Sequence, residues 1–354
     1  MVQMEKYTRF VRRKKLVFLI AAAATLVIAL FSIGVGSIQI PVKEIIGTIF
    51  GRGELQSQTV IMGIRLPRVT AAILVGAILA TSGAVMQCEL RNPLASASTL
   101  GVSQGAAFGA ALGIIVFGGG VVNSASAASA VTIDNPYIVT LCAFVFGALS
   151  TVVIIAISQL KKDIGPAGLV LAGVALSSLV YGGSTVRQYF ADEQKIGAVV
   201  FWTFGNLGGA NWTELLILLL VFFCSMIYFM LNRWNYKAME SGADTAKSLG
   251  VNTRVVMVVS MAICSLAASV AVSFVGIISF VGLVAPHIMR RFVGNDFRYL
   301  VPCSAVAGAL LLILADTFGK WIIAPVILPI GAITSFLGAP MFLFLLFKGV
   351  KTNG

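Results

Sequence analysis

The chain has 354 residues, of which 58% are hydrophobic and 11% are charged, whereas a water-soluble domain has about a quarter charged residues. This composition excludes a soluble globular protein and predicts a polytopic membrane protein. The formal net charge of +12 is spread among apolar runs, which is typical of loop charges that orient helices and not of a nucleic-acid-binding face.

Ten apolar runs in the chain each approach the roughly 20 residues that a helix needs to cross a bilayer. We therefore expect an all-α integral membrane fold in which residues 1–354 form a single transmembrane domain. The first run is longer than the apolar region of a cleaved signal peptide, which has about 7–15 residues, so we interpret it as a retained helix. The expected spans are 16–36, 68–87, 98–117, 136–158, 166–183, 212–231, 254–272, 273–289, 300–318 and 328–347.

The basic residues orient these spans. If the basic N-terminal segment 1–15 lies in the cytoplasm and the spans alternate, 18 of the 25 Lys and Arg residues fall on cytoplasmic segments. Because cytoplasmic loops are enriched in Lys and Arg, this orientation is favoured. An even number of spans then places both termini in the cytoplasm.

In this orientation the sequence RLPR at 65–68 lies outside, where few basic residues are expected. The simplest interpretation is that both arginines extend to lipid headgroups. Just before it, apolar residues recur with helical spacing through 42–50, which predicts a helix on the outer interface. At the outer end of the ninth span, Asp316 and Lys320 are one helical turn apart. We expect an ion pair there, and a proton-coupling carboxylate is the alternative.

Within the third span, Gly105, Gly109 and Gly113 recur at four-residue intervals. A stripe of small residues lets two helix backbones approach closely, so the stripe predicts a helix-packing surface. Lining of a transport pathway is the alternative.

The longest cytoplasmic loop, at about 232–253, contains signals for a short helix. The spacing at 241–244 is typical of a capping box, and Gly250 is suited to end the helix. Such a helix would expose small residues such as Ala243 and Ala246, which suits docking into a groove on a partner. A plain helical connector is the alternative.

The sequence contains no catalytic or metal-binding motif. It has neither a GxxxxGK[ST] phosphate-binding loop nor a GxGxxG motif, and His287 is its only histidine. The widely spaced cysteines indicate neither a disulfide framework nor a metal site. We therefore expect no cofactor and no enzymatic activity, and any ATPase that drives transport must be another chain. The cysteines are Cys88, Cys142, Cys224, Cys264 and Cys303.

Many motifs of the chain occur in the order found in one known family. They are RLPR at 65–68, SGAVMQ at 82–87, RNPLA at 91–95, LGVSQGA at 100–106, LAGVALSSL at 171–179, FWTFGNL at 201–207, A-x-x-L-G at 246–250, FVGLVAPHIMR at 280–290, LAD at 314–316 and LPIGAITSFLGAPMFLFLL at 328–346. Over roughly residues 16–348 the sequence resembles the FecCD family of ABC-transporter permeases, which includes the vitamin B12 importer permease.

The resemblance implies a type II ABC importer in the cell membrane of a prokaryote. In such an importer, two permease subunits of about ten helices each form one pathway. Two cytoplasmic ATPase subunits dock on one side and an extracytoplasmic substrate-binding protein on the other. The two permease subunits are identical in some systems and different in others. An iron–siderophore complex or another iron chelate is the expected substrate, and haem or cobalamin is the alternative.

Site residues are also implied by the resemblance. The outward basic residues that match those engaging carboxylates of the binding protein are Arg65, Arg68 and Lys320. The coupling helix that seats in the ATPase matches Ala243, Ala246, Leu249 and Gly250. The chain departs from frequent family residues at Ser96, Ala97, Ile327 and Phe297, and at Lys320, where the vitamin B12 permease has an arginine. A lysine cannot make the bidentate carboxylate contact that an arginine makes.

The polar residues suited to line the pathway are Gln87, Asn92, Ser103 and Gln104. Hydrogen bonds between packed helices are the alternative role for them. A protein of a different class, an ion-coupled secondary transporter, would need ionisable residues near the middle of the membrane. Few ionisable residues are present at that depth. The candidates Glu214 and Asp316 both lie near the ends of their spans.

Overall fold

The computed structural model describes residues 2–36, 40–49, 51, 54–121, 132–133, 135–160, 165–323 and 326–350. Each predicted span coincides for most of its helical residues with one helix of the structure, which confirms the all-α fold. These helices are α1 (Val2–Gly34), α4 (Leu66–Glu89), α5 (Val102–Ile115), α6 (Pro136–Leu160), α7 (Gly165–Tyr189), α9 (Trp212–Leu231), α12 (Thr253–Val275), α13 (Val281–Val293), α14 (Phe297–Trp321) and α15 (Ile330–Val350).

Shorter elements connect them. They are α2 (Val42–Ile49), α3 (Leu55–Val60), the π-helical turn η1 (Ile61–Arg65), α8 (Glu193–Thr203), α10 (Arg233–Glu240) and α11 (Ala243–Ser248). The two-residue strands β1 (Gly120–Val121) and β2 (Thr132–Ile133) pair antiparallel, with Gly120 opposite Ile133. The predicted outer helix at 42–50 is present as α2, and the helix predicted inside the loop at 232–253 is present as α11.

The helices of the described ranges differ in whether they are long enough to cross a bilayer. Seven are long and apolar enough to do so, and α5 and α15 are shorter apolar helices. Helix α13 has 13 residues, which span only about 20 Å at a rise of 1.5 Å per residue. The chain is therefore a multi-pass membrane protein in which some helices reach only part of the way.

The start predicted for the eighth span, residue 273, is wrong. Helix α12 continues to Val275 and ends at Gly276, which has a φ of +76°. A side chain at Gly276 would collide with the carbonyl oxygen of Trp202, so only glycine allows this close approach. The next helix, α13, begins only at Val281 because Phe280 has a left-handed backbone with a φ of 64°.

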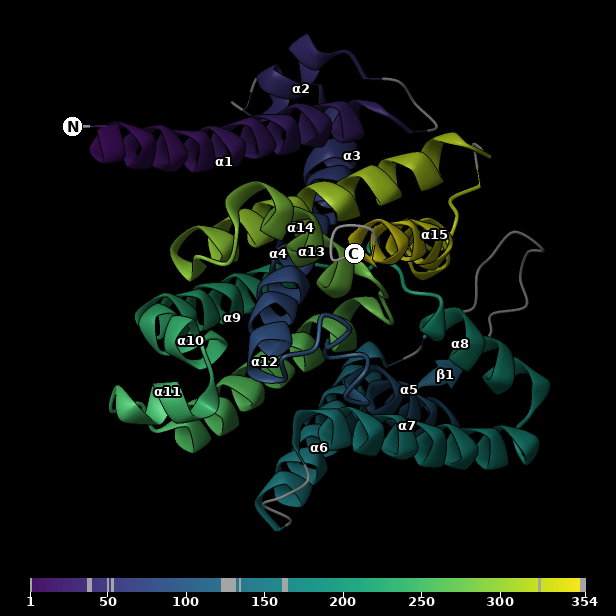
Figure 1. The fold of residues 1–354 in the computed structure, drawn as a ribbon. Helices are drawn as coiled ribbons and strands as arrows, with labels where there is room; N and C mark the ends of the chain where they lie inside the picture. Colours follow the sequence, from purple (N-terminus) through teal and green to yellow (C-terminus); the bar gives the residue numbers. More distant parts are fainter. Residues whose placement is uncertain are drawn as a thin grey trace.

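Helix α4 lies at the centre of the bundle. It packs against α9, α12, α13 and α14, and Figure 1 shows it between α14 and α12, with α1 on one side and α6 on the far side. The span that ends at Glu89 is 89% buried, whereas the α7 span is only 17% buried. The close contact with α14 depends on Gly76 and Gly308, because a Cβ on either would collide with the backbone of the other.

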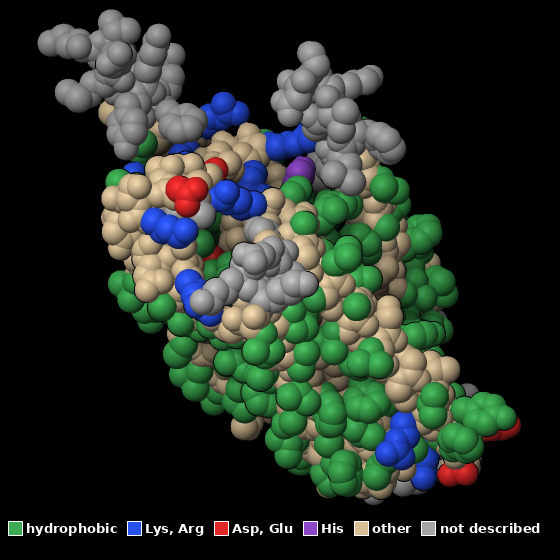
Figure 2. Space-filling model, turned by 60° about the horizontal axis from the view of Figure 1, so that its bottom comes forward, with side chains coloured by type: hydrophobic (Ala, Val, Ile, Leu, Met, Phe, Trp, Pro, Cys, Tyr) green, Lys and Arg blue, Asp and Glu red, His purple; other side chains and the backbone are tan. Residues whose placement is uncertain are grey.

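The surface divides into charged ends and an apolar middle. Figure 2 shows Lys and Arg side chains gathered at one end, a broad belt of hydrophobic side chains next to them, and a smaller charged group at the opposite end. This distribution is the one expected of a protein embedded in a bilayer.

Candidate functional site

Arg65 closes the C-terminal end of the first helix, α1. It is the last residue of η1, its side chain is buried, and its Nη1 donates to the carbonyl oxygens of Ile33 at 2.7 Å and Gly34 at 3.2 Å. These are the last two residues of α1, whose terminal carbonyls have no partner within the helix. The cation also lies at the negative end of the helix dipole, where it stabilises the helix.

Arg68 is bound to a carboxylate on another helix. Its Nε and Nη2 lie 2.9 and 2.8 Å from Oδ1 of Asp316 on α14. Lys320, one turn further along α14, places its Nζ 2.6 Å from Oδ2 of the same carboxylate and 3.3 Å from the hydroxyl of Ser32 on α1. The predicted Asp316–Lys320 ion pair is thus confirmed, and Asp316 has a second cationic partner, Arg68, that the sequence pattern did not indicate.

These side chains form one buried group, which we call the outer charge cluster after the side of the membrane predicted for it: Ser32, Arg65, Arg68, Asp316 and Lys320. The three cations are each 8% exposed and Asp316 is 2% exposed. Asp316 forms ion pairs with Arg68 and Lys320, whereas Arg65 is bonded to the carbonyl oxygens of α1. The structure brings together all three basic residues that were predicted to dock the binding protein, and each has partners within its own chain. Docking by these residues stays a prediction.

The outer charge cluster also touches the segment that follows α8, a helix that the sequence analysis missed. A Cβ on Gly208 would lie 3.0 Å from Nη1 of Arg68. The same segment bonds to two other helix ends, through Asn206 N to the carbonyl oxygen of Val275 at 2.7 Å and Gly331 N to that of Phe204 at 2.9 Å. Arg68 thus connects α14 with the segment that joins the C-terminal end of α12 to the N-terminal end of α15.

At the opposite end of the bundle, α10 is anchored under the spans. The ring of Tyr236 is fully buried, lies 5.4 Å from the ring of Phe297, and its hydroxyl is 3.0 Å from that of Ser260 on α12. Burial raises the pKa of Tyr236, so the hydroxyl keeps its proton for this contact. Nη2 of Arg91 also donates to the carbonyl oxygen of Met239 at 2.9 Å.

Helix α11 ends as predicted. Gly250 has a φ of +83°, its N–H donates to the carbonyl oxygen of Lys247 at 2.9 Å, and the N–H of Val251 donates to that of Ala246 at 3.0 Å. This pair of bonds is a Schellman motif, in which a left-handed glycine ends the helix. The exposed residue beside it is Leu249, at 69%.

Two details predicted for α11 are wrong. Ala246 is fully buried and not exposed, because it packs into the core below the spans. The helix begins after Gly242, and no side chain caps it, so the predicted capping box at 241–244 does not form. The hydroxyl of Ser241 instead donates to the carbonyl oxygen of Lys237 at 3.5 Å. Ala243 is the first residue of the helix.

Three of the four predicted pathway residues have hydrogen bonds within the chain. The amide of Gln87 donates to Leu283 of α13 at 3.3 Å and accepts from Arg290 at 2.8 Å. Asn92 accepts from the N–H of Leu94 at 2.9 Å, and the hydroxyls of Ser103 and Ser98 are 3.0 Å apart. Gln104 is half-buried on α5. Their role in the pathway stays a prediction.

The glycine stripe of α5 packs against α6. A Cβ on Gly109 would collide with the backbone of Cys142, and one on Gly105 with the Ser150 side chain and the Phe146 carbonyl. The helix-packing interpretation of this stripe is therefore confirmed.

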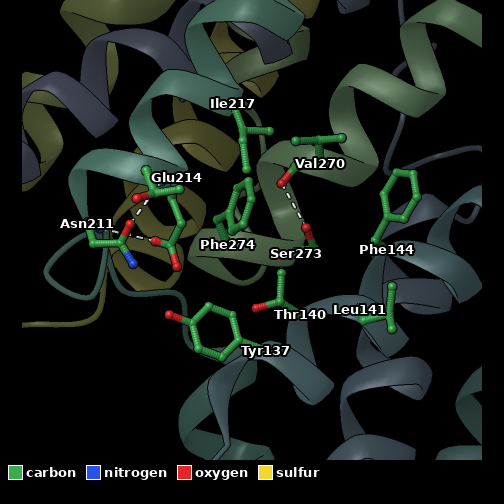
Figure 3. A pocket seen from close by; sticks show the side chains of 11 residues that line it. Tyr137, Thr140, Leu141, Phe144, Asn211, Glu214, Ile217, Val270, Ser273 and Phe274 are labelled. Carbon is green, nitrogen blue, oxygen red and sulfur yellow. Dashed lines mark hydrogen bonds between the residues drawn. The ribbon is translucent and has the colours of Figure 1, made fainter.

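A cavity of about 370 Å³ lies between α6, α9 and α12 (Figure 3). Its walls are mostly apolar, and Asn211 and Glu214 lie together at one side of it. Glu214 accepts from the N–H of Asn211 at 3.1 Å, and Asn211 accepts from the N–H of Glu214 at 3.0 Å. This carboxylate thus belongs to the capping box that begins α9.

Comparison with known proteins identifies the family of the chain. The sequence model of the FecCD transport family matches residues 24–348. The chain belongs to the FecCD transport family. A protein of Methanocaldococcus jannaschii that carries the name of an ABC transporter permease is 49% identical over 348 residues, which cover 98% of each chain.

Other relatives of this FecCD permease have names that specify a substrate. The Fe(3+)-citrate import system permease protein YfmE of Bacillus subtilis is 35% identical, over 97% of this chain and 98% of its own length. The hemin transport system permease protein HmuU of Yersinia pestis is 34% identical, over 81% of this chain and 83% of its own.

A solved structure confirms the fold of the FecCD permease. It is described as an inward-facing conformation of a metal-chelate type ABC transporter. It is 29% identical, has a TM-score of 0.81 and matches 94% of this chain and 98% of the solved chain. The chain is thus an ABC-transporter permease with the type II importer fold, a kind of subunit that works with an ATPase and a substrate-binding protein.

Proposed function

We propose that this FecCD permease carries an iron chelate from an external binding protein to the cytosol. The support comes from family membership over 24–348 together with relatives named for Fe(3+)-citrate and hemin import. The chain contains no phosphate-binding loop, so ATP hydrolysis belongs to a separate ATPase chain. The FecCD permease itself contributes the pathway and its two docking faces.

The two ends of the molecule suit different partners. The outer charge cluster has an excess of positive charge, which favours acidic side chains of a substrate-binding protein. At the other end, α11 exposes Leu249 beside the left-handed Gly250, which suits insertion into a groove of the ATPase. Most of the lysines and arginines lie on this side, so it and both termini face the cytoplasm.

A second permease subunit, identical or different, completes the pathway. Helix α7 is the least buried of the spans that the structure describes, and it exposes large apolar side chains such as Leu171, Leu179 and Tyr189. These side chains do not pack in the core of this chain, so they are free to contact a second permease subunit. Gln87, Asn92, Ser103 and Gln104 are proposed as polar points along the route.

Uptake into vesicles tests the proposal. The FecCD permease is reconstituted with its cognate ATPase and binding protein, and uptake of radiolabelled iron chelate is measured with ATP on the cytoplasmic side. We expect uptake only when all components and ATP are present. Uptake of haem or cobalamin, but of no other iron chelate, would show that haem or cobalamin is the substrate instead. Uptake by the permease chain alone under an ion gradient would contradict the importer mechanism.

A further inference from the structure

A second cavity lies beside the coupling segment, at the end of the molecule predicted to face the cytoplasm. It has a volume of about 290 Å³ and is formed where α4, α10 and α13 end and α14 begins. We call it the inner pocket, and the lining residues that matter here are Gln87, Arg91, Glu240, Arg290, Asn295 and Phe297. No role for this cavity follows from the outer charge cluster or from α11.

The inner pocket holds two cations whose hydrogen bonds to the described residues reach neutral oxygens, and the charge of Glu240 acts on Arg290 from the pocket wall. Arg290 donates from Nη1 to the amide oxygen of Gln87 at 2.8 Å, and Arg91 donates from Nη2 to the carbonyl oxygen of Met239 at 2.9 Å. The nearby carboxylate, Glu240, forms its ion pair with Lys237 at 2.8 Å. Each guanidinium has five N–H donors, so both have donors left to offer a ligand.

The backbone of Arg91 adopts a conformation that is unfavourable for a residue other than glycine. Arg91 has a φ of 43°, in the left-handed region that a non-glycine residue seldom adopts. Together with its bond to Met239, this conformation fixes the position of Arg91 between the end of α4 and the end of α10. Arg91 is exposed, and this bond holds it at the wall of the inner pocket.

Charge and position limit the occupant. Two guanidinium groups favour an oxyanion, since they can bind a carboxylate with charge-assisted hydrogen bonds. A phosphate group carries up to about two negative charges, and Glu240 in the wall would repel it more than a single carboxylate. The cavity also ends where Glu240 ends α10, three residues before α11 begins. A protein docked on α11 is therefore next to the pocket.

We propose that the inner pocket receives an acidic side chain of the ATPase chain, which forms an ion pair with Arg91 and Arg290. This rests on the proposed function, because it needs an ATPase that docks on α11. The contact would join the ATPase to α4 and α13 directly, in addition to the contact through α11.

Charge reversal in the assembled complex tests this contact. Binding of the ATPase to the FecCD permease is measured in lipid nanodiscs for the wild type, for Arg290→Glu and for Arg291→Glu. Arg291 is the exposed neighbour of Arg290 and does not line the pocket, so it is the matched control. We expect Arg290→Glu to weaken binding by at least about tenfold and Arg291→Glu to change it by less than about twofold. Equal affinities for the two variants would overturn the proposal.

Charge exchange identifies the partner residue. Acidic residues of the ATPase are changed to lysine one at a time, and each is combined with Arg290→Glu. We expect one exchange to restore binding, and failure of every exchange would overturn the proposal. If the wild-type permease itself does not bind the ATPase, the proposed function fails and this contact fails with it. Binding by the wild type that is unaffected by the pocket variants refutes the contact alone.

A second variant covers the case in which Arg290→Glu does not fold, since Arg290 also holds Gln87. Asn295 is exposed and lines the pocket, so Asn295→Cys can be modified in the folded protein with thiol reagents of equal length, one anionic and one neutral. We expect the anionic adduct to weaken ATPase binding more than the neutral one, because it competes for the two arginines. Equal effects of both adducts would contradict the proposed contact.

Discussion

Asp316 is the residue on which the outer charge cluster depends. It is 2% exposed and forms ion pairs with both Arg68 and Lys320, so two buried cations depend on one carboxylate. Because all these groups are buried, the interaction is little screened by water or salt. Loss of the carboxylate would leave buried cations without a counter-charge, which costs far more than loss of a surface pair.

We expect Asp316→Asn to lower the stability of the permease by about 3–5 kcal/mol, as a marked drop in the melting temperature of the detergent-solubilised protein. Asp244→Asn is the control. It removes an ion pair with Lys247 in which the aspartate side chain is 99% exposed, and such pairs contribute little or nothing. Equal melting temperatures for the two variants would show that the cluster does not stabilise the fold.

Docking by the outer charge cluster needs a variant that leaves the fold intact. Lys320→Gln removes one charge and keeps the Arg68–Asp316 pair. We expect it to weaken binding of the substrate-binding protein several-fold and to reduce the dependence of binding on salt, because a cation has been lost from the interface. Lys195→Gln, at a half-exposed outer lysine paired with Asp192, is the control. Unchanged affinity for Lys320→Gln would remove Lys320 from the docking surface.

At the scale of elements, the glycines of α5 set the distance to α6. We expect Gly109→Val to destabilise the permease by about 1–3 kcal/mol, since the added side chain collides with the Cys142 backbone. Gly182→Val is the matched control because Gly182 is also helical but has open space around it. Thermal unfolding in detergent compares the two. A smaller loss for Gly109→Val than for Gly182→Val would contradict the packing role of the stripe.

The end of α11 is the second element with a clear test. Gly250 has a left-handed backbone, and a β-branched residue there is strained by roughly 1–2 kcal/mol although the space around it is open. We expect Gly250→Val to reduce stimulation of the ATPase while the permease stays folded. The control Gly47→Val also has open space, but no positive φ. Full stimulation by Gly250→Val would argue against α11 as the coupling helix.

The sequence predicted these elements where the signals are local. Long apolar runs, the spacing of three glycines and a glycine after a helical segment identified the spans, the α5–α6 contact and the end of α11. Other features depend on residues far apart in the chain. Arg68 and Asp316 are 248 residues apart, and no local pattern connects them. Helix α8 was missed because its 11 residues are too few for a span.

For the whole molecule, burial is concentrated along one axis. The α4 span is 89% buried, while the α1 and α9 spans are 22% buried. The membrane or a second subunit must therefore cover much of the outer ring. Charged side chains lie at the two ends of the molecule (Figure 2). Labelling one exposed residue at each end therefore tests the orientation of the protein in the membrane.

We expect an impermeant maleimide to label Asp192→Cys, but not Asp244→Cys, in vesicles with the outer face of the membrane outward. Both positions have highly exposed side chains, at 79% and 99%, and they lie at opposite ends of the predicted topology. Labelling is compared in a background without the exposed native Cys224. Labelling of Asp244→Cys from outside would reverse the orientation and move both proposed docking faces to the other side.

The bond from Arg65 to the end of α1 also bears on how the protein is made. The ribosome completes Gly34 31 residues before it adds Arg65, so α1 enters the membrane without the side chain that closes its last turn. The carbonyl groups of Ile33 and Gly34 must face water or headgroups until α4 arrives. Helices α1 and α4 are therefore expected to settle in the bilayer as a hairpin, and an insertion arrest between them would leave α1 frayed at its outer end.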